Sequence, residues 1–534
     1  TRKLDISVRP ATPMATTLAL GSFTGSKEVP TPRDLVPEFR KQEVAISVLP
    51  LALAPGLMSY LDNFEHLCTE QLVSRTLPAL VLARRPEFAP DRTPVSAAKT
   101  LDGTLRMLRT RQNAQGGFGL WTASVQADEF ASVYAVHLML EARELDVPGS
   151  QVPPDLLQKG LDYLQQLAAS NPADLNAART RAYAIYLLTR NGAVTTPLLA
   201  GLRETLDAKF GAAWKTDAIA SFMAATYQLL KQDKPANELL GPMVKQLETG
   251  GATYRYAHYS DPTIRDAQLL YLLARHFPAR LKSLEPTTFA RFVTPIANGA
   301  YNTLSSSWAI LAIDAMARQL GGDALGKLSV AQVDAKGKSV DLRLPANLLP
   351  RVAFDAGTTK LRLANDGPLT TWYAVTQTGF DRMPPTTELK AGLEVLREYV
   401  GADGKPVTSV KIGDELTVKL SLRGMAMSGK DSGNSDVGNV ALTDLLPGGF
   451  EPVQSRDPNG ATSTVTGAGL EFADVREDRV VLYAAATDQV QTWSYRIRAT
   501  NLGEFTVPPV WAQSMYERER QARSLAGKVV VSAK

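Results

Sequence analysis

The spacing of apolar residues changes twice along the chain. Residues 1 to about 48 alternate apolar and polar positions, as in Leu4–Pro10, Thr17–Leu20 and Glu43–Leu49, which predicts β-strands. From about residue 52 to residue 325, apolar residues recur at helical spacing, broken by short loops with Pro or Gly. Alternation returns from about residue 327 to the end. The predicted order is therefore strands, a large block of helices, and strands again.

The helical block repeats loosely, with similar helices about 40 to 50 residues apart. Each has small residues on one face and Leu, Tyr or Phe on the other, so a single helix pair cannot bury its apolar stripe alone. Stacked helix pairs at this period predict either an open solenoid or a closed α/α toroid. The recurring helices begin near Phe130, Ala178, Asp217, Ile264 and Ser306.

Composition narrows the class of protein. At 534 residues the chain is too long for one core, and we expect about three or four domains. Hydrophobic residues make up 44% and charged residues 21%, as in ordinary globular proteins. The 58 basic and 54 acidic residues are interspersed, so nothing indicates nucleic-acid binding. No apolar run is long enough to span a bilayer, and Thr1 leads into a strand pattern without a signal peptide, as in a fragment.

The clearest candidate for chemistry is Cys68, the only cysteine, which stands three positions before Gln71. A thiol at this spacing can attack the side-chain carboxamide, expel ammonia and close an internal thioester, which is a stored acyl electrophile. A lone cysteine cannot form an intramolecular disulfide, so it is either a small buried hydrophobe or this reactive group. A single thiol fits both the cytosol and a disulfide-free periplasmic protein.

Other segments occur in register with Cys68. The Gly116–Trp121 segment, some fifty residues after Cys68, predicts a glycine-rich turn. Pro384 and Pro385 indicate a linker into a final domain. With these features the chain resembles bacterial alpha-2-macroglobulins over essentially its whole length. The segments that carry the resemblance are Cys68–Gln71, Gly116–Trp121, Gly392–Arg397, Val440–Phe450 and Phe505–Tyr516.

The resemblance implies a multidomain α and β fold. Residues 51–326 look like an α/α toroid, the thioester domain shared with complement proteins. It would be inserted in a CUB-like β-sandwich made of residues 1–50 and 327–382. Residues 386–534 resemble the C-terminal, receptor-binding-like macroglobulin β-sandwich. The bait region and the preceding macroglobulin domains of the family are not expected in this chain.

The resemblance also implies the C-terminal part of a broad-spectrum protease trap. It implies no enzyme, and therefore no catalytic residue, cofactor or metal. In this family, bait cleavage exposes a thioester, here Cys68 and Gln71, and a lysine of the target protease attacks it. The family shields the resting bond with side chains from the toroid and the terminal domain. The matching positions in this chain are Phe64, Trp121, Met515 and Tyr516. The implied partners are target proteases, and the implied role is evasion of host defence. The implied location is the periplasm, and any association with the inner membrane would come through a segment or partner outside this chain.

Two departures from the family pattern keep a rival interpretation open. Leu67 stands where most members have glycine, and His66 where an aromatic residue is common. The rival is a thioester-inactive macroglobulin scaffold that binds envelope proteins. Family members that prefer hydroxyl targets carry a histidine after the Gly-Gly-Phe turn, and none lies between Trp121 and Tyr134. The resemblance therefore implies that an intact site favours amines.

An enzyme is the third class, because α/α toroids also occur in glycosidases, terpene cyclases and prenyltransferases. The sequence has no Asp-rich magnesium motif and no Asp/Cys/His zinc set, while paired acid and base carboxylates stay open. His137, among Val, Leu and Met, is expected to be a packed or partly exposed side chain. Glu70 is expected to be hydrogen-bonded or solvated, and Asp128 and Glu129 to be charges at a helix N-terminus.

Overall fold

The computed structural model describes residues 10–48, 50–84, 93–250, 257, 259–320, 327–346, 349–427, 435–453 and 464–534. Most of the strand predicted at residues 4–10 lies outside them. By its contacts the chain divides into two compact units. The toroid unit is Thr16–Pro32 with Lys41–Gln377, and the sandwich unit is Thr1–Ala15, Arg33–Arg40 and Thr378–Lys534. Within the described residues, no helix is both long and apolar enough to cross a membrane.

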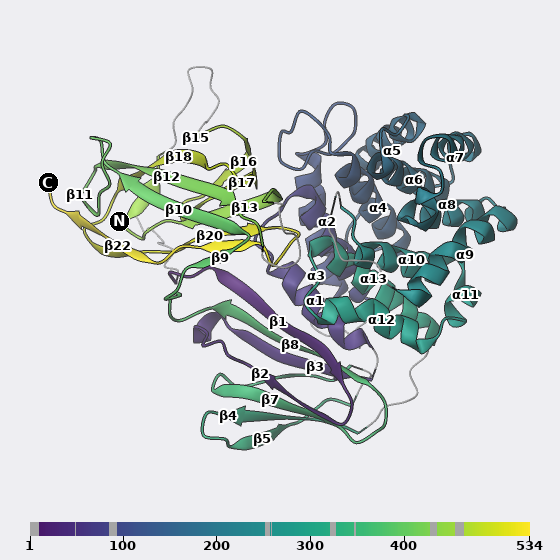
Figure 1. Ribbon diagram of the computed structural model, residues 1–534, viewed down its shortest axis with the longest axis horizontal. Coiled ribbons are helices and arrows are strands. Elements are labelled where there is room, and N and C mark those ends of the chain that lie inside the picture. The colour runs from purple at the N-terminus through teal and green to yellow at the C-terminus, as the bar shows by residue number, and fades with distance from the viewer. Residues whose placement is uncertain are drawn as a thin grey trace. The chain divides into compact units, whose positions relative to one another are not determined.

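Helices occupy the middle of the chain (Figure 1). Those labelled α2, α4, α6, α8, α10 and α13 contact one another in sequence, and α13 returns to α2, so they close an inner ring. The remaining long helices pack outside this ring. The helices are α1 (Leu53–Asp62), α2 (Thr69–Leu82), α3 (Pro94–Arg109), α4 (Glu129–Leu145), α5 (Pro154–Ala169), α6 (Leu175–Arg190), α7 (Thr196–Phe210), α8 (Ala218–Leu229), α9 (Asp233–Thr249), α10 (Pro262–His276), α11 (Pro278–Lys282), α12 (Pro286–Ala297) and α13 (Thr303–Leu320).

The inner helices run in the same direction, because an outer helix returns the chain after each inner one. Two contacts between their first turns agree with this. Thr303 at the start of α13 donates to the Glu70 carboxylate in α2 at 3.0 Å, and Asn302 donates to Asp261 at the start of α10 at 3.4 Å. The ring therefore has one end made of helix N-termini and one made of helix C-termini. Of the two predicted arrangements, the closed toroid is the correct one.

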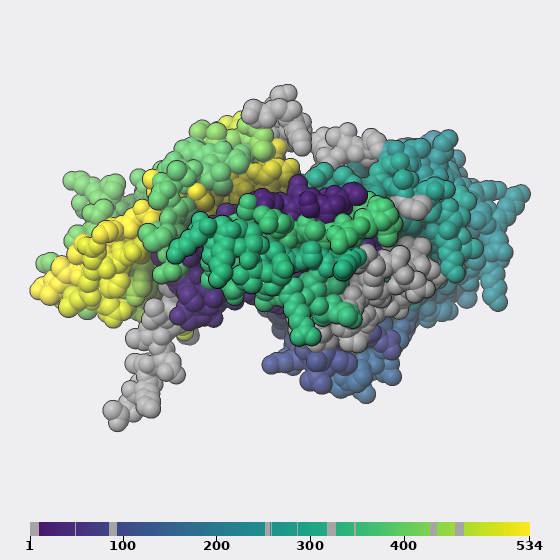
Figure 2. Space-filling view, turned by 90° about the horizontal axis from the view of Figure 1, so that it is seen from below, coloured from purple at the N-terminus to yellow at the C-terminus, as the bar shows by residue number. Residues whose placement is uncertain are grey.

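Strands from before and after the helices pair with each other in the toroid unit. The two sheets have the orders β1-β8-β3-β6 and β2-β7-β4-β5. In the space-filling view the purple first strands lie against the green strands that follow the helices (Figure 2). The strands are β1 (Met14–Phe23), β2 (Ser26–Pro30), β3 (Lys41–Ser47), β4 (Leu328–Asp334), β5 (Ser339–Leu342), β6 (Arg351–Ala353), β7 (Thr358–Asn365) and β8 (Thr371–Phe380).

Strand β8 joins the sheets to the helices because both of its faces are buried. Tyr373 and Val375 pack in the small core between the two sheets, whereas Trp372 and Ala374 belong to the large helical core. A side chain added at Gly56 of α1 would meet Ala374 at 3.0 Å, so helix and strand approach closely there. The continuous apolar run Trp372–Val375 of β8 fits this burial of both faces.

In the described part of the sandwich unit most strands pair antiparallel, and β11 pairs with β22 in parallel. Its sheets have the orders β10-β12-β18-β14, β16-β17-β13-β20-β21-β9 and β11-β22-β19. Alternating residues of β12 and β18 fill its core, where Trp493 and Tyr495 are buried. The strands are β9 (Leu389–Ala391), β10 (Leu393–Val400), β11 (Ser409–Lys411), β12 (Glu415–Gly424), β13 (Val437–Leu445), β14 (Phe450–Pro452), β15 (Val465–Thr466), β16 (Leu470–Val475), β17 (Arg479–Ala486), β18 (Gln491–Ala499), β19 (Gly503–Val507), β20 (Val510–Ser514), β21 (Gln521–Arg523) and β22 (Gly527–Ser532).

The predicted fold class is confirmed: strands flank an α/α toroid, and a β-sandwich region follows. The exact domain boundaries stay predictions. The contacts also group Arg33–Arg40 with the sandwich unit, a division that the sequence did not indicate. Arg33 explains part of it, because its guanidinium pairs with Asp381 at 3.0 Å and donates to the Ala15 carbonyl at 2.8 Å.

Candidate functional site

Cys68 is the N-cap residue of α2, the position just before the first helical turn. The other inner helices place a carboxylate or amide there, which accepts a backbone N–H of the first turn as helix caps usually do. These caps are Asp128, Asp174, Asp217, Asp261 and Asn302. A thiol is a weak acceptor and a poor substitute for them. Cys68 therefore departs from the capping pattern of its own ring, and its side chain is 2% exposed.

Gln71 folds back onto Cys68. The two residues form a capping box, in which the Gln71 N–H faces the thiol and the Cys68 N–H donates to Gln71 Oε1 at 2.9 Å. This follows from their spacing, since N-cap and N3 residues of a helix are the pair that can reach each other's backbone. The Gln71 carboxamide is thereby held at the backbone of the residue that carries the thiol.

Leu67 fits this turn without backbone strain. Its φ is negative, a region open to any residue, and Cys68 is extended with φ −63° and ψ 169°. Glycine is therefore not required at position 67 in this chain. The neighbouring His66 is buried and lies edge-on to Phe64, with ring centroids 5.3 Å apart.

The Gly116–Trp121 turn lies directly against the start of α2. The Thr69 N–H donates to the Leu120 carbonyl at 3.0 Å, and the Thr69 hydroxyl donates to the Gly119 carbonyl at 2.6 Å. The turn itself depends on Gly116, whose φ is +90° and whose added Cβ would lie 2.1 Å from the Lys159 carbonyl oxygen. The two sequence segments predicted to work together are thus in contact.

Arg111 is the residue that sequence reasoning missed. It lies just after the end of α3, and its buried side chain donates to the Leu67 carbonyl at 2.7 Å and the Leu120 carbonyl at 2.9 Å. It also contacts Thr69 Oγ1 at 3.2 Å and lies 5.9 Å from the Trp121 ring centroid. Arg111 therefore links the residue before Cys68 to the turn opposite.

The predicted shielding residues fall in both units. Phe64 packs edge-on against Tyr60 at 5.5 Å between centroids, and Trp121 lies beside Arg111. Met515 and Tyr516 follow β20 in the sandwich unit, where the Met515 N–H donates to the Asn439 carbonyl at 3.0 Å. Phe64 and Trp121 are in the same unit as Cys68, and the shielding role of all four residues stays a prediction.

Burial raises the pKa of the Cys68 thiol well above its usual range, and the Glu70 carboxylate adds to this. Hydrogen bonding from the backbone and the charge of Arg111 act in the opposite direction. Glu70 itself is fully buried and accepts from Ser74 at 2.5 Å and Thr303 at 3.0 Å. The solvated alternative for Glu70 is wrong, because this carboxylate faces the hydroxyls of α2 and α13 and not water.

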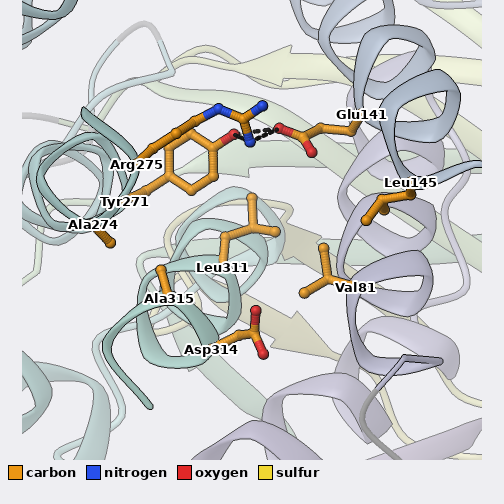
Figure 3. A pocket seen from close by; sticks show the side chains of 9 residues that line it. All are labelled: Val81, Glu141, Leu145, Tyr271, Ala274, Arg275, Leu311, Asp314 and Ala315. Atoms are coloured by element: carbon orange, nitrogen blue, oxygen red, sulfur yellow. Dashed lines mark hydrogen bonds and ion pairs between the residues drawn. The ribbon is translucent and has the colours of Figure 1, made fainter. Parts of the chain in front are cut away.

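The opposite end of the ring holds a different cluster. Glu141 of α4 pairs with Arg190 of α6 at 2.8 Å and with Arg275 of α10 at 3.3 Å, and accepts from Tyr271. Figure 3 shows Arg275 and Tyr271 pointing toward the Glu141 carboxylate at a pocket of about 170 Å³. The buried His137 continues the cluster inward, with Nδ1 2.5 Å from the Tyr183 hydroxyl.

This second cluster is built from charges that compensate one another. His137 is packed, as expected from its apolar neighbours, and burial lowers its pKa. The described residues contain no group of His, Cys, Asp and Glu side chains that could hold a metal ion. The candidate pair of Cys68 and Gln71 lies at the N-terminal end of the ring, and the ion pairs of Glu141 lie at the C-terminal end.

Comparison with known proteins gives matches across the chain. Residues 392–519 match the family model described as the bacterial alpha-2-macroglobulin MG10 domain. An alpha-2-macroglobulin homolog of Yersinia pestis is 34% identical over 561 residues, which cover 99% of this chain and 27% of that protein. This chain thus spans about a quarter of the length of that relative.

Two solved structures share the fold. Native Escherichia coli alpha-2-macroglobulin, from domain MG7 to its C-terminus, has a TM-score of 0.76 at 19% identity, covering 98% of this chain and 83% of that one. Salmonella alpha-2-macroglobulin reacted with methylamine has a TM-score of 0.76 at 19% identity, covering 99% of this chain and 34% of that one. At these identities the similarity is one of fold.

Proposed function

We propose that this chain, which belongs to the bacterial alpha-2-macroglobulins and corresponds to their C-terminal region, carries the covalent capture site of a protease trap. The single observation that carries the proposal is the capping box at Cys68, with Gln71 Oε1 2.9 Å from the Cys68 N–H. It holds the attacking thiol and the carboxamide together in a buried turn. No enzymatic activity is part of this proposal.

The bond would form in one acyl transfer. The Cys68 sulfur attacks the side-chain carbonyl carbon of Gln71, the carbon–nitrogen bond breaks, and the amide nitrogen leaves as ammonia with the thiol proton. A primary amine, such as a lysine of a protease, then attacks the same carbon. The carbon–sulfur bond breaks, one amine proton returns to the sulfur, and an amide crosslink remains. Holding both reactants in one turn makes the first step intramolecular.

Burial protects the resting bond in two ways. It excludes water, and it raises the pKa of the thiol that must leave when the thioester opens. A thiolate is a poorer leaving group inside the dry site than in water, where its pKa is about 8.5. Opening the site would therefore expose the acyl carbon and improve the leaving group together. Phe64, Trp121, Met515 and Tyr516 are the proposed shields.

Two observations support this proposal. Leu67 has negative φ, so the departure from the family glycine does not strain the turn. Methylamine is a small primary amine, and the Salmonella protein of the same fold is described as reacted with it. Methylamine and its labelled analogues are therefore the probes of choice for this chain.

The test is incorporation of a fluorescent primary amine into the native chain, followed by peptide mapping. We expect one label on the peptide that contains Gln71, and none in the Cys68→Ala or Gln71→Ala variants. The variant Cys68→Ser serves as a matched control, since it keeps the size of the side chain. Equal labelling of all four proteins would show that the label enters elsewhere and would contradict the proposal.

The rival function is a thioester-inactive scaffold that binds envelope proteins. One observation favours it: the capping box alone explains why Cys68 and Gln71 lie together, because it stabilises the start of α2. A native chain that takes up no amine, yet loses stability in the Gln71→Ala variant, would support this rival. It would leave the pair with a capping role only.

Target proteases as partners and a periplasmic location are parts of the same proposal. They rest on membership of the family and on no feature of the described residues. Fractionation of the source cells, with a periplasmic and a cytosolic marker, tests the location. Recovery of the chain with the cytosolic marker would contradict the proposed periplasmic location and, with it, the proposed encounter with external proteases.

A further inference from the structure

We propose that Arg111 is a positioning residue of the thioester reaction: it holds the Leu67–Cys68 peptide so that the N–H of that peptide stabilises the oxyanion on Gln71 Oε1. This inference rests on the proposed capture function and adds the group that orients the reacting carbonyl. Its basis is the set of hydrogen bonds that meet at one peptide group.

The two ends of the Leu67–Cys68 peptide are bound by different residues. Arg111 donates to the carbonyl oxygen of this peptide, which belongs to Leu67, at 2.7 Å. The N–H of the same peptide, which belongs to Cys68, donates to Gln71 Oε1 at 2.9 Å. A peptide group is planar, and a trans peptide points its carbonyl and N–H in opposite directions. Fixing the oxygen from one side therefore fixes the direction of the N–H on the other.

That N–H lies where charge develops. When sulfur or an amine attacks the Gln71 side-chain carbon, the electron pair of the carbonyl bond moves onto Oε1, which becomes an oxyanion until the leaving group departs. A backbone N–H already within 2.9 Å of this oxygen is a preorganised donor for it. A guanidinium on the opposite carbonyl polarises the same peptide, which strengthens the N–H as a donor.

Arg111 is itself held firmly enough to serve this purpose. The same nitrogen that reaches the Leu120 carbonyl at 2.9 Å also contacts Thr69 Oγ1, and the Arg111 carbonyl accepts the Gly119 N–H at 2.9 Å. Arg111 is 7% exposed, its bond to Thr69 Oγ1 is buried, and its bonds to the two carbonyl oxygens are partly buried. The planar, forked guanidinium suits two carbonyl oxygens at once, which a lysine serves less well.

The position of the charge agrees with this role. The guanidinium acts against the burial that raises the pKa of the Cys68 thiol. A sulfur leaving beside Arg111 is therefore better stabilised than one in the same pocket without it. Geometry and charge thus favour the same step, the passage of the acyl group through its tetrahedral intermediate.

The test compares Arg111→Gln and Arg111→Lys with the native 534-residue chain. Two rates are measured on the thioester-containing fraction: reaction with methylamine and spontaneous hydrolysis. We expect Arg111→Gln to slow both by about 10-fold to 100-fold, because the oxyanion donor is misplaced. Both rates of Arg111→Lys should lie between those of the native chain and of Arg111→Gln, since lysine keeps the charge and lacks the forked guanidinium. The direction of the change separates the roles, because a merely structural arginine would loosen the site and make both reactions faster.

Arg190→Gln is the matched control, because Arg190 is comparably buried at the other end of the ring, with a side chain 4% exposed. It should lower the unfolding temperature and leave both rates within about 3-fold of the native values. Unchanged or faster reactions in both Arg111 variants would overturn the proposal. A native chain without any thioester would instead overturn the capture function, and this inference with it.

Discussion

The two ends of the inner helical ring satisfy their buried polar groups in different ways. At the N-terminal end, the Cys68 N–H donates to Gln71 Oε1, and Arg111 donates to the carbonyl oxygens of Leu67 and Leu120. At the C-terminal end, Glu141 is held by two arginines from two other helices. Cys68 and Gln71 thus lie among hydrogen bonds to backbone groups, whereas Glu141 lies in a cluster of ion pairs.

This difference separates reactivity from stability. A buried ion pair that loses one partner leaves an uncompensated charge, which is strongly destabilising, so the Glu141 end tolerates little change. A neutral thiol and carboxamide can react, or be replaced, without leaving a buried charge. A bond that must break in use is better placed at the end where its loss does not unfold the ring.

The largest expected effect is the loss of amine capture in Cys68→Ala. We expect no incorporation of methylamine, because no thioester can form, while the unfolding temperature stays close to that of the native chain. Mass spectrometry of the methylamine-treated protein measures the first, and thermal unfolding the second. Capture by the alanine variant would show that another group carries the acyl chemistry.

Arg190→Gln should have the opposite profile. We expect it to lower the free energy of unfolding by about 3 kcal/mol, because Glu141 and Glu144 each lose a partner, at 2.8 Å and 2.6 Å. Methylamine uptake per folded molecule should not change. Denaturant titration gives the stability, and a loss below about 0.5 kcal/mol would mean that Arg275 alone compensates the two carboxylates.

The Glu141 end should also make the ring sensitive to acid. Burial and the nearby Arg275 and Arg190 lower the pKa of His276 from 6.5 to about 3. A lowered pKa in the folded state means that its stabilisation is complete above pH 6.5 and is lost as the pH falls toward 3. Between pH 6.5 and pH 5 this amounts to about 2 kcal/mol. Denaturant titrations at both pH values should show it, and His276→Gln should flatten the dependence.

The Cys68 end should respond to base instead. In the thioester-free variant Gln71→Ala, the buried thiol keeps a pKa raised above its unfolded value of about 8.5. A raised pKa in the folded state means that stability is complete below pH 8.5 and declines above it, by up to about 2 kcal/mol at pH 10. The double variant with Cys68→Ala lacks this decline. Parallel curves for the two proteins would mean that the thiol is not dry.

The smallest expected effect concerns the proposed shields. Tyr516→Ala should speed the spontaneous loss of the thioester several-fold, by admitting water, and Trp121→Ala should do the same from within the toroid unit. The loss is followed by intact mass over time. If only Trp121→Ala speeds it, the shield belongs to the toroid unit, and Tyr516 drops out of the mechanism.

Much of the fold could be predicted because the spacing of apolar residues is periodic and the Pro and Gly residues mark where elements end. Helical spacing with a repeat of about 40 to 50 residues predicts stacked helix pairs, and alternation on both sides predicts the flanking strands. The choice between an open solenoid and a closed ring needed the contact of α13 with α2, which joins residues far apart in the chain. No local pattern encodes that closure.

The site was predicted only in part, for a physical reason. Cys68 and Gln71 could be found from sequence because a lone cysteine three positions before a glutamine is a local pattern. The structure adds that the two are the N-cap and N3 residues of a helix. Arg111 cannot be told apart from Arg109, two residues earlier, which is 51% exposed and pairs with Asp155. Only the tertiary fold buries one of them. The sequence also held a signal that marks the position of Cys68. Asp or Asn residues recur at regular spacing as caps of the inner helices, and Cys68 is the exception.

The most direct test of the account is the intact mass of the native chain with and without methylamine, beside a titration of free thiol. We predict a mass one ammonia below the sequence value, no free thiol, and one thiol released as one methylamine is taken up. Full sequence mass with a free thiol before treatment would contradict a live thioester. A mass with Glu in place of Gln71 would instead show a bond that had formed and been hydrolysed.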